Sequence, residues 1–377
     1  MNILTSDFET TILNKGNVYD ARNKAVCLGE KVNNNVATCM FNTHMLATAE
    51  TKFDLYVFFN AKFDVGWYRR LGVDISNWKI WDCQIAEFLL EGQTNPYPSL
   101  NQAAEKYGFP VKLDVVKTEY WDKGVDTDKV PEDVLSDYCC YDVELTYKVY
   151  LKQLEQFQEK PALFKLFKLM CQDMLILQEM EWNGIVYDEQ LCKERSLTID
   201  KQLQEIKDNL NLIYPSMAIN FNSGDQLSAF LYGGTIVEDG KEHVGFYKTG
   251  AKAGLPKYKN IQIEHQLPRL ITPLAKSELQ KEGYFKTDAA TLQKLKGPAA
   301  KKFVGPLLEM AKLEKLNGTY YKGIPQLVQE MNWTDGVIHG SYNQCRAATG
   351  RLSSSQPNQQ NFSGEMLDVF VSRYGEN

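Results

Sequence analysis

At 377 residues, the chain is long enough for two or three domains with cores of their own. Its hydrophobic fraction of 44% and charged fraction of 24% are ordinary for a soluble globular protein, and its formal net charge is −6. No uncharged apolar run approaches the roughly 18 residues of a membrane-spanning helix, and the first residues lack a signal-peptide pattern. We therefore expect no association with a membrane.

Strands and helices alternate over the first 150 residues. Strands are predicted at residues 2–8, 25–32, 36–41, 55–59 and 79–82. Helices are predicted at residues 63–71, 83–90 and 100–107, and from Pro131 towards residue 158. This order predicts a mixed α/β domain.

The pattern becomes mainly helical after Pro161. It is broken at Asn183-Gly184, continues to Leu212, and returns at residues 287–296 and 299–331. Residues 233–284 are rich in Gly, Lys and Pro with weak periodicity, which predicts an insertion of loops and short strands.

Charge is unevenly distributed along these segments. Residues 1–150 carry 15 Lys and Arg against 22 Asp and Glu, whereas residues 241–302 carry 13 against 5. An acidic region and a basic one suit a protein that binds metal ions and follows phosphates, and they suit two solvated surfaces equally well.

The eight cysteines are scattered, and none forms a CxxC or Cys/His pattern with the spacing of a zinc site. The adjacent Cys139 and Cys140 lie in a helical pattern and are predicted to be buried thiols. A reducing, cytoplasmic setting is expected for such a chain.

Carboxylates recur at three places in the first domain. Asp7 and Glu9 stand two residues apart on a predicted strand, so their side chains face the same side. Asp64 lies just inside a predicted helix, four residues after Asn60. Tyr138 and Asp142 are one helical turn apart on one face. Each feature alone is typical of an ordinary acidic surface.

In this order and spacing, the three features resemble the DEDD exonuclease superfamily, and the tyrosine resembles the subclass found in family A (polymerase I-like) DNA polymerases. The resemblance implies that Asp7, Glu9, Asp64 and Asp142 bind two divalent cations, Mg²⁺ or Mn²⁺. Hard carboxylate oxygens independently suit these ions. Tyr138 would hydrogen-bond the attacking water, and Asn60 would contact the DNA.

The rest of the chain resembles the parts of a family A polymerase that follow its exonuclease. Residues 222–227, Asn-Ser-Gly-Asp-Gln-Leu, are similar to a thumb motif that grips the primer–template, which implies DNA contacts for Asn222, Ser223 and Gln226. Residues 344–361 contain Thr-Gly-Arg-Leu-Ser-Ser and Pro-Asn-Gln-Gln-Asn, similar to the first palm motif. DNA contacts are implied there for Arg346, Arg351, Asn358, Gln360 and Asn361. Gln359 departs from the family's usual leucine.

The resemblance implies a ribonuclease H-like α/β exonuclease domain at residues 1–155. A mainly helical thumb at 156–335, with a basic insertion near 233–284, and an incomplete palm at 336–377 would follow. The palm's catalytic aspartates are expected to lie beyond these residues. The layout is similar to compact bacteriophage enzymes, which would place the chain in the host cytoplasm.

The implied function is a 3′–5′ proofreading exonuclease acting in DNA replication. Its partners would be a single-stranded DNA 3′ end, a primer–template duplex, and a second polypeptide carrying the rest of palm and fingers. Two alternatives stay open. One is a non-catalytic DNA-binding subunit of a split polymerase, and the other is an RNA-processing DEDD exonuclease. A split polymerase, an interrupted gene and a truncated product all remain compatible with the sequence.

Overall fold

The computed structural model describes residues 1–374 apart from residues 42, 44–51, 112–113, 216 and 251. They form two compact units, one from Met1–Leu191 together with Gly323–Asn377 and one from Cys192–Lys322. Residues near both ends of the chain therefore share the first unit.

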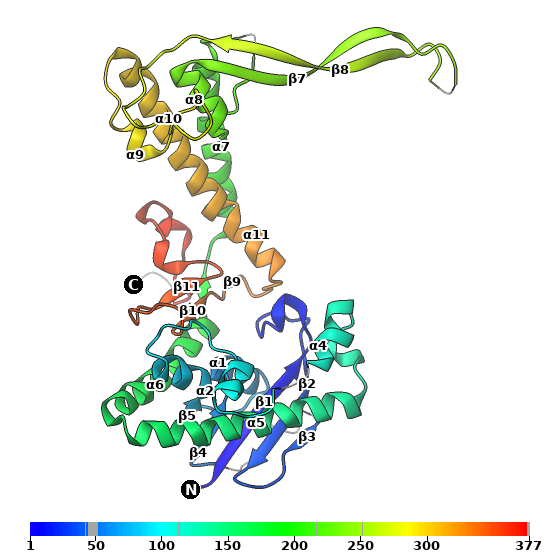
Figure 1. Ribbon diagram of the computed structural model, residues 1–377, viewed down its shortest axis with the longest axis vertical. Coiled ribbons are helices and arrows are strands. Elements are labelled where there is room, and N and C mark those ends of the chain that lie inside the picture. The colour runs from blue at the N-terminus through cyan, green and yellow to red at the C-terminus, as the bar shows by residue number, and fades with distance from the viewer. Residues whose placement is uncertain (42, 44–51, 112–113, 216, 251, 375–377) are drawn as a thin grey trace. The chain divides into compact units, whose positions relative to one another are not determined.

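The first unit contains a five-stranded sheet with the strand order β3-β2-β1-β4-β5 (Figure 1). β2 and β3 are antiparallel to their neighbours, whereas β4 and β5 run parallel to β1. The strands are β1 (Ile3–Thr10), β2 (Ala25–Val32), β3 (Thr38–Met40), β4 (Leu55–Phe58) and β5 (Ile80–Asp82). All five predicted strands are confirmed, with small shifts at their ends.

Helices flank this sheet. They are α1 (Ala61–Arg70), α2 (Cys83–Leu90), α3 (Leu100–Lys106), α4 (Val115–Glu119), α5 (Glu132–Gln158) and α6 (Pro161–Asn183). α5 packs across β1, β2 and β3, whereas α1 packs against β1, β4 and β5. The expected mixed α/β architecture is confirmed at this level.

Local signals explain where several helices begin and end. Asp82 caps α2 by accepting hydrogen bonds from the backbone amides of Gln84 and Ile85. Pro161 occupies the first turn of α6, where its missing N–H is no loss. Gly184 ends α6 with a φ of 58°, and an added Cβ there would lie 2.7 Å from the carbonyl oxygen of Ile338. The predicted break at Asn183-Gly184 is thereby confirmed.

The main core of the first unit is aromatic. Trp81 of β5 packs against Phe167 of α6 with ring centroids 4.6 Å apart, and Phe157 of α5 lies 5.0 Å from Phe167. All three rings are buried. α6 thus belongs to this core, beyond the residue 155 at which the first domain was expected to end.

The segment after residue 323 completes the first unit. It contains α11 (Gly323–Glu330), β9 (Val337–Ile338), β10 (Ser341–Asn343) and β11 (Ser353–Ser355). β9 pairs with β6 (Ile185–Val186), and β10 pairs with β11. Glu181 of α6 connects α1 to this segment. Its carboxylate forms an ion pair of 2.7 Å with Lys62 of α1 and accepts a hydrogen bond of 2.6 Å from the Tyr342 amide.

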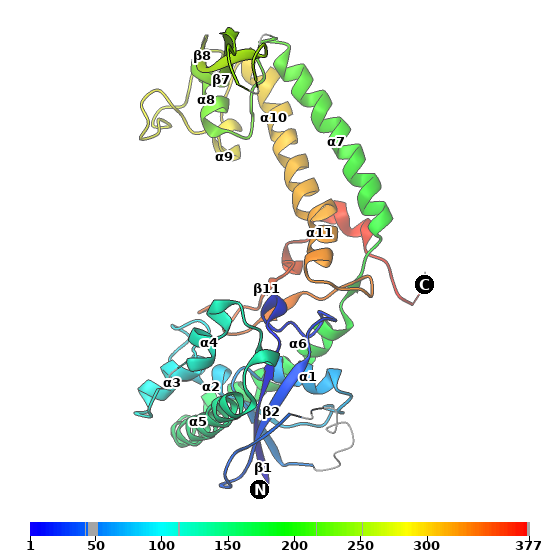
Figure 2. The ribbon, with the colours of Figure 1, turned by 90° about the vertical axis from the view of Figure 1, so that its right-hand side faces the viewer.

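The second unit is mainly helical, as expected. Its helices are α7 (Glu189–Asn211), which begins in the first unit, α8 (Gly224–Tyr232), α9 (Ala289–Leu292) and α10 (Pro298–Leu316). α7 and α10 run side by side (Figure 2), linked by an ion pair of 2.8 Å between Lys207 and Glu314. Phe230 of α8 packs edge-on against Phe303 of α10 with centroids 5.6 Å apart.

A long two-stranded ribbon extends from this unit. β7 (Gly234–Phe246) pairs antiparallel with β8 (Pro256–Leu267) (Figure 1). Most side chains of the ribbon are exposed. The expectation of loops and short strands at residues 233–284 is therefore wrong for the ribbon itself. Within the described residues, no helix is both long and apolar enough to cross a membrane.

Candidate functional site

Asp7 and Glu9 lie on the face of the sheet that α5 covers. In the antiparallel ladder, Asp7 stands opposite Gly29 and Glu9 stands opposite Cys27. Residues two apart on a strand face the same side, so the side chains of Asp7 and Glu9 project together, as predicted. Directly opposed residues also share one face of a sheet, so Gly29 and Cys27 lie on this face too. Glu9 is 6% exposed, whereas Asp7 is only partly buried.

Asp64 reaches the same place from α1. Its Oδ1 accepts a hydrogen bond of 2.9 Å from the amide of Phe8, the residue between the two strand carboxylates. The side chain is 1% exposed. Burial, and after it the charge of Asp7, raise the pKa of Asp64 well above its usual range. A neighbouring cation would therefore strongly stabilise the ionised form of the Asp64 carboxylate.

Tyr138 and Asp142 approach from α5. Burial, and then the charges of Glu9 and Asp142, raise the pKa of Tyr138, so its phenol keeps its proton. The Tyr138 hydroxyl donates to Oδ1 of Asp114 at 3.3 Å. The structure therefore brings the five residues of the predicted active site to one location, from β1, α1 and α5.

The donor set fits hard divalent cations. Carboxylate oxygens of Asp7 and Glu9 lie within 4.8 Å of each other and of the Cys139 sulfur, a cluster dense enough to hold a metal ion. Oxygen ligands of this kind suit Mg²⁺ or Mn²⁺. Neutralising these charges would also relieve the repulsion that raises the pKa of Asp64.

Sequence reasoning missed two aspartates beside this group. Asp82 is buried, accepts from the amide of Ala61 at 2.8 Å, and adds to the charge that raises the pKa of Asp64. Its position directly before α2 is a capping signal that was available in the sequence. Asp114, the acceptor for Tyr138, follows no motif and could not have been found in that way.

An apolar cavity of 470 Å³ adjoins Tyr138, and it was also missed. Most of its wall consists of valines from α4, from α5 and from the loop before α4, together with Tyr141. A cavity of this size and lining can accommodate a flat apolar group such as a nucleobase.

Asn60 does not join the carboxylates directly. It is the N-cap of α1, with a left-handed φ of 64°, and its side chain is exposed. It lines a separate cavity of 490 Å³ whose wall also includes Lys62, Glu181 and Ser341. Its implied contact with DNA stays a prediction.

The predicted thumb residues lie in the second unit, where they shape the start of α8. Ser223 caps this helix by accepting from the Gln226 amide at 3.4 Å, and the Gln226 side chain accepts from the Asn220 amide at 2.8 Å. The Asn222 amide group donates to Glu314 at 3.2 Å. These bonds fix the loop and leave its DNA contacts a prediction.

The predicted palm residues lie on the segment after α11, apart from the elements that carry the carboxylates. Asn358 caps a 3₁₀ turn by accepting from the Gln360 amide, and the Gln360 side chain donates to the carbonyl of Leu352. Gln359 accepts a hydrogen bond from the Tyr342 hydroxyl, which gives its departure from leucine a structural reason. The remaining predicted contacts, all exposed, are Arg346, Arg351 and Asn361.

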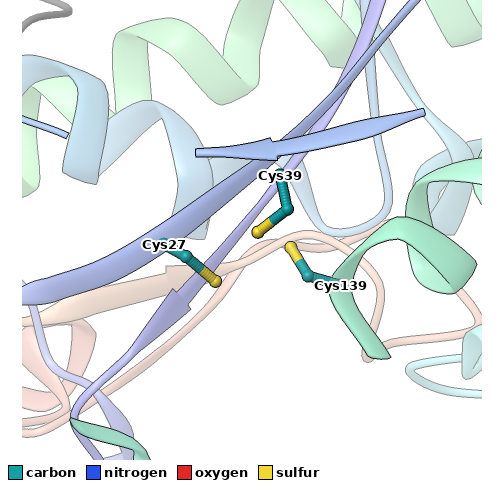
Figure 3. Close-up of side chains that lie close together, drawn as sticks. All are labelled: Cys27, Cys39 and Cys139. Carbon is teal, nitrogen blue, oxygen red and sulfur yellow. The ribbon is translucent and has the colours of Figure 1, made fainter. Parts of the chain in front are cut away.

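Three buried or partly buried cysteines gather behind the carboxylates, contrary to the expectation from spacing. The sulfurs of Cys27, Cys39 and Cys139 lie within 4.8 Å of one another (Figure 3). Cys139 is buried as predicted, whereas Cys140 is partly exposed. The spacing rule failed because the three thiols come from three separate elements.

Comparisons with known proteins found similarity to DNA polymerases. Residues 253–371 match the family model of DNA polymerase family A. The chain is 29% identical over 307 residues to DNA polymerase I of Synechocystis sp., covering 80% of this chain and 26% of that protein. It is 23% identical over 351 residues to the DNA polymerase of Bacillus phage SP01, covering 85% of this chain and 37% of that one.

A solved structure shares the fold. The POL domain of Pol1 from M. smegmatis, in complex with DNA primer-template and dNTP, superposes with a TM-score of 0.66 at 18% identity. The match covers 98% of this chain and 55% of that one. The chain thus spans only a part of the proteins it is similar to, between 26% and 37% of the two polymerases compared above.

Proposed function

We propose that this chain, a relative of the family A DNA polymerases, is the 3′–5′ proofreading exonuclease portion of such an enzyme. The sequence similarity supports the family and a role in DNA replication. The observation that supports exonuclease activity in particular is that residues from three segments, up to 135 positions apart in sequence, surround one site. These residues are Asp7, Glu9, Asp64, Tyr138 and Asp142.

In this proposal, the four carboxylates hold two Mg²⁺ or Mn²⁺ ions. The bound ions would supply water activation and stabilisation of the leaving oxygen. The Phe8 amide fixes the Asp64 carboxylate in place, and the β1 backbone sets the spacing of Asp7 and Glu9. The protonated Tyr138 hydroxyl donates its hydrogen to Asp114, and its oxygen would hold the attacking water by accepting a hydrogen bond from it.

The reaction is hydrolysis of the terminal phosphodiester. The water oxygen bonds to phosphorus, the bond from phosphorus to the 3′ oxygen of the preceding nucleotide breaks, and that oxygen takes up a proton. The products are a nucleoside 5′-monophosphate and a DNA strand shorter by one nucleotide. The apolar cavity beside Tyr138 offers the terminal base a place to lie.

Binding of primer–template DNA is the second part of the proposal. Asn222, Ser223 and Gln226 would contact the backbone from the second unit. Five residues after α11 would lie along the duplex: Arg346, Arg351, Asn358, Gln360 and Asn361. The similar fold of a polymerase domain that holds primer-template supports this assignment. Polymerisation itself would need the palm aspartates and fingers, which we propose a further polypeptide segment supplies in the same cytoplasm.

Oligonucleotide digestion tests the proposal. The chain, given Mg²⁺, is incubated with 5′-labelled single-stranded DNA and with RNA of the same sequence. We expect stepwise shortening of the DNA from its 3′ end. Faster digestion of RNA would favour an RNA-processing exonuclease, and DNA binding without digestion would favour a non-catalytic subunit.

A matched pair of variants on α5 distinguishes loss of a metal ligand from a general effect on the fold. Asp142→Ala removes a proposed metal ligand and should abolish digestion. Asp133→Ala removes an exposed carboxylate from the first turn of the same helix and should leave the rate unchanged. Equal rates for both variants would contradict the assignment of Asp142.

A further inference from the structure

The three gathered thiols form an arrangement that the proposed exonuclease does not use. Cys27 lies on β2, Cys39 on β3 and Cys139 on α5, and their sulfurs point toward one another (Figure 3). All sulfur pairs are within 4.8 Å. We propose that Cys27, Cys39 and Cys139 form a binding site for a thiophilic divalent cation of the Zn²⁺ class.

The strand register explains why the two strand thiols meet. Cys39 stands opposite Gly29, and Gly29 is two residues from Cys27 on β2. Residues two apart on a strand face the same side, so both thiols project from one face of the sheet. That face is the one covered by α5, which brings Cys139 over the gap between them.

Gly29 allows this close approach. A Cβ at position 29 would lie 2.7 Å from the Cys139 sulfur and 2.8 Å from a methyl group of Val143. Without a side chain there, α5 can pack low enough for Cys139 to reach both strand thiols. The glycine therefore makes room for the cluster, beyond any role in β2 itself.

The geometry favours a cation over a disulfide between the strand thiols. Cys27 and Cys39 are diagonal neighbours, for which a Cα separation of roughly 7–8 Å is typical, at or above the range of most disulfides. A tetrahedral ion with Zn–S bonds of about 2.3 Å needs sulfurs about 3.8 Å apart. Because no two of the sulfurs are more than 4.8 Å apart, closing the cluster requires a movement of at most about 1 Å, within reach of small side-chain rotations.

The surroundings favour positive charge. Carboxylate oxygens of Asp7 and Glu9 lie within 4.8 Å of the Cys139 sulfur, on one side of the cluster. Apolar side chains of Val116, Val130 and Leu135 pack in one buried cluster with Cys27 and Cys139. Soft thiolates select Zn²⁺ or Cd²⁺ over Mg²⁺, so the thiol site and the carboxylate site would take different ions. Cys39 is partly exposed and gives the ion its route of entry.

Absorption spectroscopy with Cd²⁺ as probe tests the site without relying on nuclease activity. The metal-free chain, kept reduced by a phosphine, is titrated with Cd²⁺ while the ultraviolet charge-transfer band of Cd²⁺–thiolate bonds is recorded. We expect one equivalent to saturate the band. Zn²⁺ should displace Cd²⁺ and thereby abolish the absorption band, whereas a large excess of Mg²⁺ should leave the band unchanged.

Two serine variants assign the band to the cluster. Cys39→Ser replaces the partly exposed ligand, so the fold should survive, and it should weaken Cd²⁺ binding by at least about tenfold. Cys140→Ser, next to Cys139 but outside the cluster, should bind like the parent chain. Circular dichroism confirms folding of both. Absence of the band in the parent chain, or an unchanged titration of Cys39→Ser, would overturn the proposal.

Discussion

Tyr138 shows how an ordinary side chain acquires a defined chemical state. Burial and the charges of Glu9 and Asp142 raise its pKa, so the phenol stays a hydrogen-bond donor at any working pH. Tyr138→Phe removes the hydroxyl alone and should lower the digestion rate by about 10²-fold, with the Mg²⁺ dependence unchanged. Rates measured against Mg²⁺ concentration check this.

Tyr147→Phe is the matched control for that measurement. Tyr147 also lies on α5, outside the cavity beside Tyr138, and its hydroxyl donates to Oδ1 of Asn34 at 2.9 Å. Its variant should digest DNA at the parent rate. If Tyr138→Phe also did so at saturating Mg²⁺, Tyr138 would have only a structural role.

Gly29 is a second residue whose effect can be measured. Gly29→Ala places a methyl group against Cys139 and Val143 at distances that no relaxed packing tolerates. We expect a loss of about 1–3 kcal/mol in the free energy of unfolding. Gly318→Ala, in the helical turn Asn317–Tyr321 with nothing within 4 Å, should be neutral or slightly stabilising. Urea denaturation compares the two, and equal stabilities would contradict the close packing of α5 on β2.

At the scale of elements, Asp20 ties the loop after β1 to the segment after α11. Its carboxylate accepts from Arg22 at 2.6 Å, Asn14 at 3.0 Å and Asn332 at 3.1 Å. Burial by itself would raise the pKa of Asp20, but the hydrogen bonds led by Arg22 outweigh it and lower the pKa to about 2. The folded state therefore prefers the charged form.

The sign of the pH dependence follows from this lowered pKa. The contribution of Asp20 is fully present above pH about 4, the unfolded pKa, and is lost as the pH falls towards 2. Asp20→Asn should destabilise the chain by about 1–3 kcal/mol at pH 7 and flatten its loss of stability in acid. Unfolding free energies at several pH values test this. The same steep acid loss in Asp20→Asn would exclude Asp20 as its source.

Elements with local signals could be predicted from sequence. Periodicity, Pro161, Gly184 and the resemblance predicted the strands of the sheet, the starts of α2, α3, α5 and α6, and the positions of Asp7, Asp64 and Asp142. The short helix α4 was not predicted. The ribbon β7–β8 was misread because both of its faces are largely exposed, so it lacks the alternation of apolar and polar residues that marks a half-buried strand.

The thiol cluster and the Asp20 links could not have been predicted. Cys27, Cys39 and Cys139 meet only through strand register and the packing of α5, and Asp20 meets Asn332 across 312 positions of sequence. Such contacts depend on tertiary structure, which local patterns do not encode. The capping role of Asp82, by contrast, was a local signal that was overlooked.

At the scale of the whole molecule, the proposed exonuclease site and the proposed palm residues belong to the same compact unit. The chain leaves that unit at α7 and returns at α11, so residues 323–374 pack with a core formed by residues before 191. The hydrogen bond from the Tyr342 amide to Glu181, whose carboxylate also pairs with Lys62, holds them together. Variants after residue 323 can therefore affect exonuclease stability as well as DNA binding.

A primer-extension assay tests whether digestion and polymerisation reside in different polypeptide segments. In the proposed assignment, residues 336–377 supply DNA contacts and no catalytic aspartate, so these 377 residues by themselves should not extend a primer. Extension should appear when a polypeptide carrying the remaining palm and fingers is added. Arg351→Ala, at an exposed position, should then impair extension more than digestion. Robust extension by the isolated chain would contradict this part of the account.

The rate at which nucleotides leave the 3′ end of single-stranded DNA tests the central claim most directly. It is measured at saturating Mg²⁺ for the parent chain and for Asp7→Ala, whose strand ladder with β2 is kept by the backbone. We predict release of nucleoside monophosphates by the parent and none above background by Asp7→Ala, because the variant loses a metal ligand. Digestion by Asp7→Ala as fast as by the parent would show that the carboxylates on β1, α1 and α5 are not the active site.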